Sequence, residues 1–118
     1  MASVRRPYVF AGDRDTVLDY ETEAREVYAR LASPKRLATF HDAGHYPFSD
    51  VCALLGPLWD ECDPDDPSWA DIPEAQQHTN ALTLAALEVE VRGRTELSEW
   101  WEPAFWDDTE MITLEVAP

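Results

Sequence analysis

Basic residues and long apolar runs are both scarce in this sequence. Lysine and arginine together number 9 against 24 aspartates and glutamates, which gives a net charge of −15. A chain this acidic repels the phosphates of nucleic acids and of anionic membranes, so we expect neither as a partner. No apolar run approaches the length that crosses a bilayer, and residues 1–6 lack the apolar core of a signal peptide. We therefore expect a cytoplasmic chain, unless an export signal lies upstream.

Cysteine is also rare. The two cysteines, Cys52 and Cys62, form no C-x-x-C pair, which argues against a zinc ribbon or a thioredoxin-like site. A disulfide and two free thiols both remain open, because the redox state of the compartment decides between them. No cofactor and no metal is expected. Hydrophobic residues make up 45% of the 118 residues, so we expect a single globular domain over 1–118.

Two apolar segments with a helical segment between them predict the centre of the fold. Residues 7–12 (PYVFAG) and 36–41 (RLATFH) are rich in residues that favour strands. Residues 19–32 place apolar side chains at helical spacing. Strand, helix and strand with short links predict an α/β fold built on a βαβ unit, whose two strands run parallel.

A polar residue of chemical interest follows each predicted strand. Asp15 comes shortly after the first strand, and His45 comes shortly after the second. Because the carboxyl ends of parallel strands lie at the same edge of a sheet, we expect these two side chains to lie close together.

The rest of the chain is predicted to wrap this unit. The helix over 76–93 has a broad apolar surface and should be buried on more than one side. The other predicted segments are a short helix over 49–55, an acidic, proline-rich loop over 57–75, and an aromatic-rich tail over 94–118 with a short helix at 96–101 and a possible strand at 109–116.

Two short motifs resemble those of α/β-hydrolases. Residues 12–17 (GDRDTV) resemble the acid turn after the seventh strand of that family, and residues 43–50 (AGHYPFSD) resemble its histidine loop after the eighth strand. The whole of residues 6–56 resembles the C-terminal part of the fold, and residues 76–93 resemble its closing helix more loosely. The nearest likeness is to the dienelactone hydrolase and platelet-activating-factor acetylhydrolase-like esterases.

The resemblance implies roles for the residues that match. In this family a serine or cysteine attacks an ester carbonyl, a histidine takes and returns the proton, and an acid orients the histidine. By motif position Asp15 would be the catalytic acid and His45 the catalytic base. Asp13 is the rival acid in the same turn.

The nucleophile of the family is missing. The glycines stand at 12, 44, 56 and 93, and no two are four apart, so the chain contains no G-x-S-x-G elbow. Nothing before residue 7 supplies the strands and the oxyanion loop that precede the acid in the family. Ser49 and Cys52 are the hydroxyl and thiol that follow His45, but no strained turn presents either one, so we do not expect them to act as nucleophiles.

Three other groups of residues have a simpler explanation than a binding site. His41 and His45 have H-x-x-x-H spacing, which suggests zinc on a helix, but Gly44 and the preceding strand argue against a helix there. The spacing of the acidic residues in the 57–75 loop partly matches that of a calcium-binding loop, but we favour a solvated acidic loop. The aromatic cluster Trp100–Trp106 is expected to pack over the core rather than to line a ligand pocket.

These observations lead to one hypothesis and two alternatives. The chain is predicted to be a truncated or split α/β-hydrolase of the carboxylic ester type, which contributes Asp15 and His45 and is inactive alone. The alternatives are a non-catalytic interaction module derived from that fold and a gene fragment without selected function. A two-stranded sheet is weakly stable and exposes an edge, so we expect a nucleophile-bearing partner or a homo-oligomer, unless the C-terminal segment covers that edge.

Overall fold

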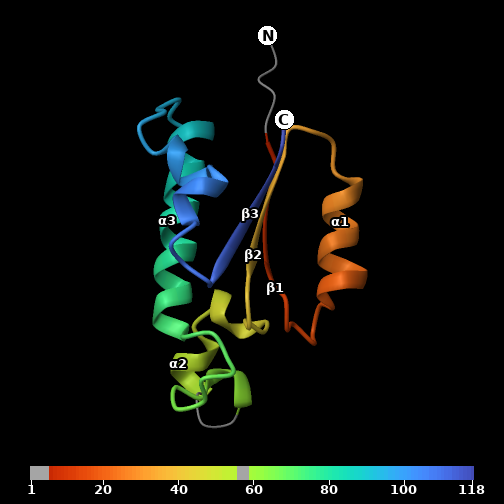
Figure 1. The fold of residues 1–118 in the computed structure, drawn as a ribbon, viewed down its shortest axis with the longest axis vertical. Coiled ribbons are helices and arrows are strands. Elements are labelled where there is room, and N and C mark those ends of the chain that lie inside the picture. Colours follow the sequence, from red (N-terminus) through yellow and green to blue (C-terminus); the bar gives the residue numbers. More distant parts are fainter. Residues whose placement is uncertain (1–5, 56–58) are drawn as a thin grey trace.

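The computed structural model describes residues 6–55 and 59–118, which form a three-stranded mixed sheet with helices on both of its faces (Figure 1). The elements are the strands β1 (Tyr8–Gly12), β2 (Lys35–Phe40) and β3 (Ile112–Ala117), the α-helices α1 (Arg25–Arg30), α2 (Val51–Leu55) and α3 (Ile72–Glu90), and the shorter helical turns η1 (Tyr20–Ala24), η2 (Tyr46–Phe48), η4 (Asp60–Cys62), η5 (Ser98–Trp101) and η6 (Pro103–Trp106).

Strand β2 lies between the other two strands. It pairs with β1 in parallel, with Tyr8 opposite Arg36 and Gly12 opposite Phe40, so the predicted parallel pair is confirmed. Strand β3 runs antiparallel along the other side of β2. The possible terminal strand therefore forms and covers that edge. Among the described residues, no strand lies beside the outer edge of β1.

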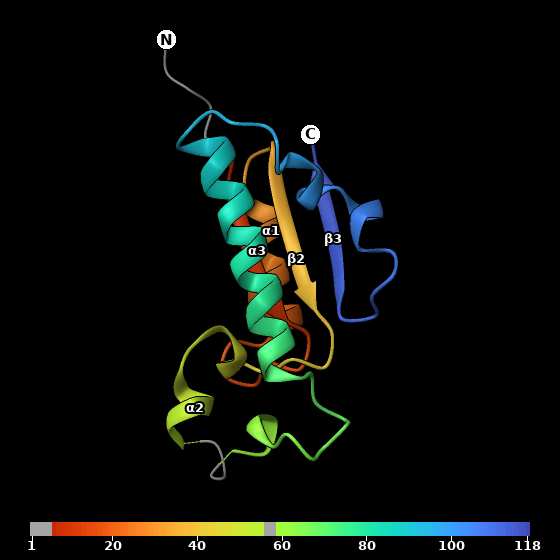
Figure 2. The ribbon, with the colours of Figure 1, turned by 90° about the vertical axis from the view of Figure 1, so that its left-hand side faces the viewer.

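The alternation of side chains along the strands gives each face of the sheet its own apolar cluster. On one face, β1, β2 and β3 pack against α3, which runs along the sheet in Figure 2. On the opposite face, Val9, Ala11 and Leu37 pack against Tyr28 of α1. Both faces are covered, which explains why the predicted strands read as nearly continuous apolar runs rather than as alternating ones.

Helix α1 continues the π-helical turn η1, and together they occupy most of the helix predicted over 19–32. The helix ends at Arg30 because Leu31 takes an extended conformation. Arg25 donates two hydrogen bonds to Glu115 of β3, at 2.6 and 2.9 Å, and these bonds hold the pKa of the Glu115 carboxyl below its usual range. The helix is therefore attached to the far strand of the sheet as well as to β1.

Helix α3 begins earlier than predicted. Asp71 caps it by accepting a hydrogen bond from the Glu74 N–H at 3.0 Å, so four residues of the loop predicted over 57–75 belong to the helix. Of that loop, residues 57 and 58 lie outside the described residues. The prediction that this helix is buried on more than one side is wrong within this chain, because Leu84, Leu87 and Val91 are exposed.

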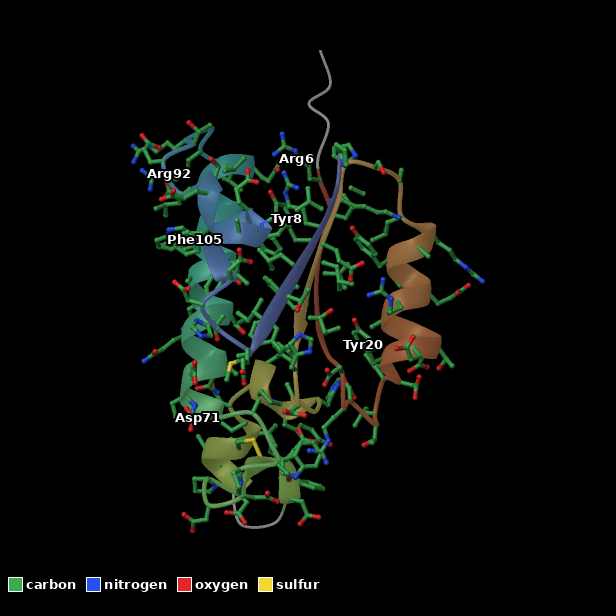
Figure 3. All side chains as sticks on the ribbon, in the orientation of Figure 1. Arg6, Tyr8, Tyr20, Asp71, Arg92 and Phe105 are labelled. Atoms are coloured by element: carbon green, nitrogen blue, oxygen red, sulfur yellow. A yellow bond between two sulfur atoms is a disulfide. The ribbon has the colours of Figure 1, made fainter. Side chains whose placement is uncertain are left out.

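The aromatic tail packs over the core, as predicted. Trp101 and Trp106 are buried, and the Trp101 indole N–H donates to the Leu82 carbonyl of α3 at 2.8 Å. The Trp101 ring also contacts the Tyr8 and Phe10 rings of β1. Figure 3 shows Tyr8 directed toward this layer and Phe105 on the outside of the tail.

Candidate functional site

The acid turn and the histidine loop pack directly against each other at the carboxyl ends of β1 and β2. The Arg14 N–H donates to the Ala43 carbonyl at 3.0 Å. A Cβ on Gly12 would overlap the carbonyl oxygens of Ala43 and Gly44. Glycine at this position therefore allows the two loops to come close enough for their side chains to meet.

Asp15 is held at both of its carboxylate oxygens. Oδ1 accepts hydrogen bonds from the backbone N–H groups of Val17 and Leu18, at 2.8 and 2.9 Å. Oδ2 lies 2.9 Å from Nδ1 of His45, and the Asp15 side chain is only 9% exposed. The predicted meeting of Asp15 and His45 is therefore confirmed as geometry, and the orientation of the carboxylate is fixed by its own turn.

The hydrogen bond to Asp15 determines which ring nitrogen of His45 carries the proton. A carboxylate only accepts hydrogen bonds, so Nδ1 is the donor in this pair and Nε2 of the neutral ring is left as an acceptor. Within residues 6–55 and 59–118, Nε2 has no hydrogen-bond partner. The side chain is 34% exposed, and it borders a cavity of about 480 Å³ together with Asp15, Phe10, Leu18 and Phe48. The ring that carries this unpartnered nitrogen thus lines an open cavity.

The histidine loop has a second support that the sequence reasoning missed. Oε1 of Glu61 accepts a hydrogen bond from the Tyr46 N–H at 2.7 Å, and its carboxylate occupies the space that a side chain on Gly44 would need. The neighbouring Cys62 forms a disulfide with Cys52, visible as the yellow bond below the sheet in Figure 3. Proximity to Cys62 was the only sequence signal that pointed to Glu61.

A second acid–histidine pair lies beside the first. Asp13, the rival acid, places Oδ2 2.9 Å from Nδ1 of His41, while its Oδ1 accepts from the Asp42 N–H at 2.8 Å. Nε2 of His41 lies 2.6 Å from the Thr113 hydroxyl of β3. Both nitrogens of His41 are therefore occupied, whereas only one nitrogen of His45 is. This difference separates a structural pair from one with a free basic nitrogen.

The local hydroxyl and thiol are both engaged elsewhere. Ser49 borders the same cavity, but its hydroxyl donates to the Tyr46 carbonyl at 3.1 Å and accepts from the Val51 N–H at 3.3 Å. Cys52 is bonded to Cys62 and has no thiol to offer. The disulfide also decides between the two states that the sequence left open for the cysteines.

The acidic loop after Cys62 uses its carboxylates to hold its own turns. Asp63 accepts from the Asp65 N–H, and Asp66 accepts from both the N–H and the hydroxyl of Ser68. The Ser68 hydrogen bonds hold the pKa of the Asp66 carboxyl below its usual range. In the described part of the chain, no three histidine, cysteine or acidic side chains are grouped as a metal site.

Comparison of this chain with protein-family models, with curated proteins and with solved structures found no match. None of the helices within the described residues has the length and apolar character needed to span a bilayer.

Proposed function

We propose that this chain supplies the acid and the base of a hydrolytic charge relay to a nucleophile on another chain, in a split hydrolase of the carboxylic ester type. The observation that carries the proposal is the Asp15–His45 hydrogen bond at a ring that borders a cavity, with Nε2 unpartnered among the described residues. Such a relay requires an acid that orients the histidine, a histidine of defined tautomer, and an open side of the histidine ring for the nucleophile.

The chemistry assigned to this chain is proton transfer at one atom. Nε2 of His45 accepts the proton of the nucleophile's hydroxyl as its oxygen bonds to the ester carbonyl. The imidazolium then donates this proton to the leaving alcohol, and the same nitrogen activates the water that hydrolyses the acyl intermediate. Asp15 keeps the ring oriented and stabilises its positive charge. The proposal assigns the oxyanion donors to the partner, together with the nucleophile.

The resemblance to α/β-hydrolases supports the same proposal. The order acid turn, helix, strand and histidine loop is that of the family's C-terminal part, and β1 and β2 would correspond to its seventh and eighth strands. The finer identity, a partial hydrolase fold of the dienelactone hydrolase type, rests on these motifs alone. The antiparallel β3 lies outside the pattern that the motifs imply.

One alternative is favoured by a separate observation. Leu84 and Leu87 of α3, with Val91 directly after its end, form an exposed apolar stripe, as an interaction module without catalysis would show. The disulfide, which is typical of oxidising compartments, weighs against the cytoplasmic prediction, which stays untested.

Ester hydrolysis on mixing two chains tests the proposal. The reading frame next to this gene is searched for a G-x-S-x-G elbow, and its product is mixed with this chain and a short-chain nitrophenyl ester. Activity should appear only in the mixture and fall by roughly 10²–10⁴-fold with His45→Ala, because proton transfer is lost. His41→Ala is the matched control, since that ring also pairs with an aspartate but has no free nitrogen.

Two results would contradict the proposal. One is activity in the mixture that survives His45→Ala. The other is an equal loss of activity with His41→Ala and His45→Ala, which would mean that both substitutions act through folding.

A further inference from the structure

The backbone of β1 offers unpaired hydrogen-bonding groups on its outer side. The Arg36 N–H donates to the Pro7 carbonyl at 3.0 Å, and the Asp13 N–H donates to the Phe40 carbonyl at 3.1 Å. Residues 7 and 13 therefore direct their backbone groups toward β2, as do the odd-numbered residues between them. By the alternation of a strand, Tyr8 and Phe10 direct their N–H and C=O groups away from the sheet. This edge has no strand beside it in the described part of the chain.

The open edge leads into the candidate site. A groove of about 480 Å³ runs between β1 and the helix formed by η1 and α1, lined by Val9, Phe10, Leu18, Ala24 and Val27 among others. Phe10, Leu18 and Ala24 also line the cavity of the Asp15–His45 pair. The groove and the cavity thus share part of their walls, and a chain lying along β1 would pass close to the cavity that the His45 ring borders.

Exposed apolar side chains flank this edge on both faces of the sheet. On the α1 side, Leu18 is 52% exposed and Val27 is 55% exposed. On the α3 side, Leu87 is 51% exposed. Leu87 lies one helical turn from Thr83, which lines the cavity. It also lies one turn from Glu90, which accepts a hydrogen bond from the Tyr8 hydroxyl. A strand added at this edge would therefore pack against apolar side chains on both faces of the sheet.

The charge near the edge decides between two occupants. Glu23 and Glu26 line the groove, Glu26 being paired with Arg30 at 2.7 Å, and the whole chain carries −15. A second copy that continued the sheet antiparallel would place its own α1 next to this one, because the two-fold axis stands perpendicular to the sheet. The glutamates of both copies would then face each other, which is unfavourable. An extended segment with lysine or arginine at its ends has no such conflict.

We propose that the outer edge of β1 is the docking site for an extended, apolar segment with basic ends, contributed by the nucleophile-bearing partner. The segment adds a strand by bonding to Tyr8 and Phe10, and it brings the partner's nucleophile toward His45. The inference rests on the proposed function for the identity of the partner, but the binding mode follows from the edge itself.

A synthetic strand tests the edge without any catalysis. The probe is a fluorescent peptide of alternating valine and threonine with two lysines at each end, and its binding to the full chain is followed by anisotropy. Leu18→Glu and Val27→Glu should weaken binding by at least roughly tenfold, since each places a charge where apolar contact is expected. Leu54→Glu is the matched control, because Leu54 is more exposed than either and lines neither the groove nor the cavity.

Backbone pairing has its own signature. Bound peptide should slow hydrogen exchange of the Tyr8 and Phe10 amides, measured by NMR, and leave the Val9 amide unchanged because it already faces β2. The same peptide with alternate N-methylated amides should not bind, and a twin with glutamates in place of the lysines should bind more weakly.

Several outcomes would overturn the inference. They are no binding at millimolar peptide, binding that resists both groove substitutions, and a stable dimer with slow Tyr8 and Phe10 exchange in the absence of peptide, which would identify a second copy as the occupant. The assay contains neither ester nor nucleophile. Peptide binding together with hydrolysis that survives His45→Ala would therefore reject the proposed function alone.

Discussion

Two substitutions at Asp15 separate its bond to the histidine from its bonds to its own turn. In Asp15→Asn, Oδ1 still accepts from the Val17 and Leu18 amides, while an NH₂ group replaces the oxygen that faces His45. In Asp15→Ala all three hydrogen bonds are lost. The asparagine variant replaces the charged bond to the imidazole by a neutral one and keeps the turn bonds, which the alanine variant also removes.

The magnitudes follow from exposure and charge. The two backbone amides are solvent-exposed, so each bond contributes about 0.5–1 kcal/mol, whereas the bond between the ionised carboxylate and the imidazole contributes about 1.5 kcal/mol. Asp15→Ala should therefore lower the free energy of unfolding by about 3 kcal/mol, and Asp15→Asn by about 0.5–1 kcal/mol, because a neutral hydrogen bond to the imidazole replaces the charged one.

Urea unfolding and imidazole ¹⁵N shifts provide the measurements. The midpoint of unfolding should move in the order wild type, asparagine, alanine, with an unchanged m-value. In Asp15→Asn the amide donates to Nδ1 of His45, so the ring proton moves to Nε2, and the ¹⁵N shifts should report this exchange of tautomers. A tautomer with its proton on Nε2 has no lone pair there to accept a proton.

Equal destabilisation by asparagine and alanine would refute the reasoning, because it would mean that the turn bonds contribute nothing. Unchanged ¹⁵N shifts in Asp15→Asn would refute it independently, since Nδ1 would then not depend on the carboxylate. The shifts of His41 serve as the internal control, as its partner is Asp13.

Three further predictions test the surroundings of the pair. Gly12→Ala should cost about 1–3 kcal/mol through overlap with the histidine loop and should disturb the same imidazole shifts, which NMR would show. Replacing Cys52 and Cys62 together by serine should lower stability in urea by about 2–3 kcal/mol, since the disulfide closes a short loop. Because Arg25 lowers the folded-state pKa of Glu115, that pair stabilises the fold above the unfolded pKa of about 4.3 and loses its effect as the pH falls below it. Glu115→Gln should therefore cost at most about 1 kcal/mol at pH 7, as both groups are partly exposed, and less at pH 3.

The central unit of the fold was predictable because its signals are local. The apolar runs that became β1 and β2, with a helical pattern between them, leave few topologies besides a parallel βαβ unit. That topology alone brings Asp15 and His45 to one edge. The distance between them then depends on Gly12, whose role as the point of close approach becomes visible only in three dimensions.

The remainder of the site depends on contacts between distant segments, which leave no periodic pattern in the sequence. Glu61 supports the histidine loop from fifteen residues away, and it lies in a loop whose many acidic residues look alike. Thr113 meets His41 only because β3 turns back antiparallel along β2. A half-exposed strand was foreseeable from the alternation over 109–116, but the side of β2 on which it would pair was not.

The antiparallel β3 also gives the sheet two different ends. In the order β1-β2-β3, the outer strands of the described residues are β1, which runs parallel to β2, and β3, which runs antiparallel to it. A strand added beside β1 would continue a parallel pair, whereas a strand added beside β3 would continue an antiparallel pair. The two edges therefore present different hydrogen-bonding patterns to an incoming strand, and exchange protection of their amides distinguishes which edge a partner uses.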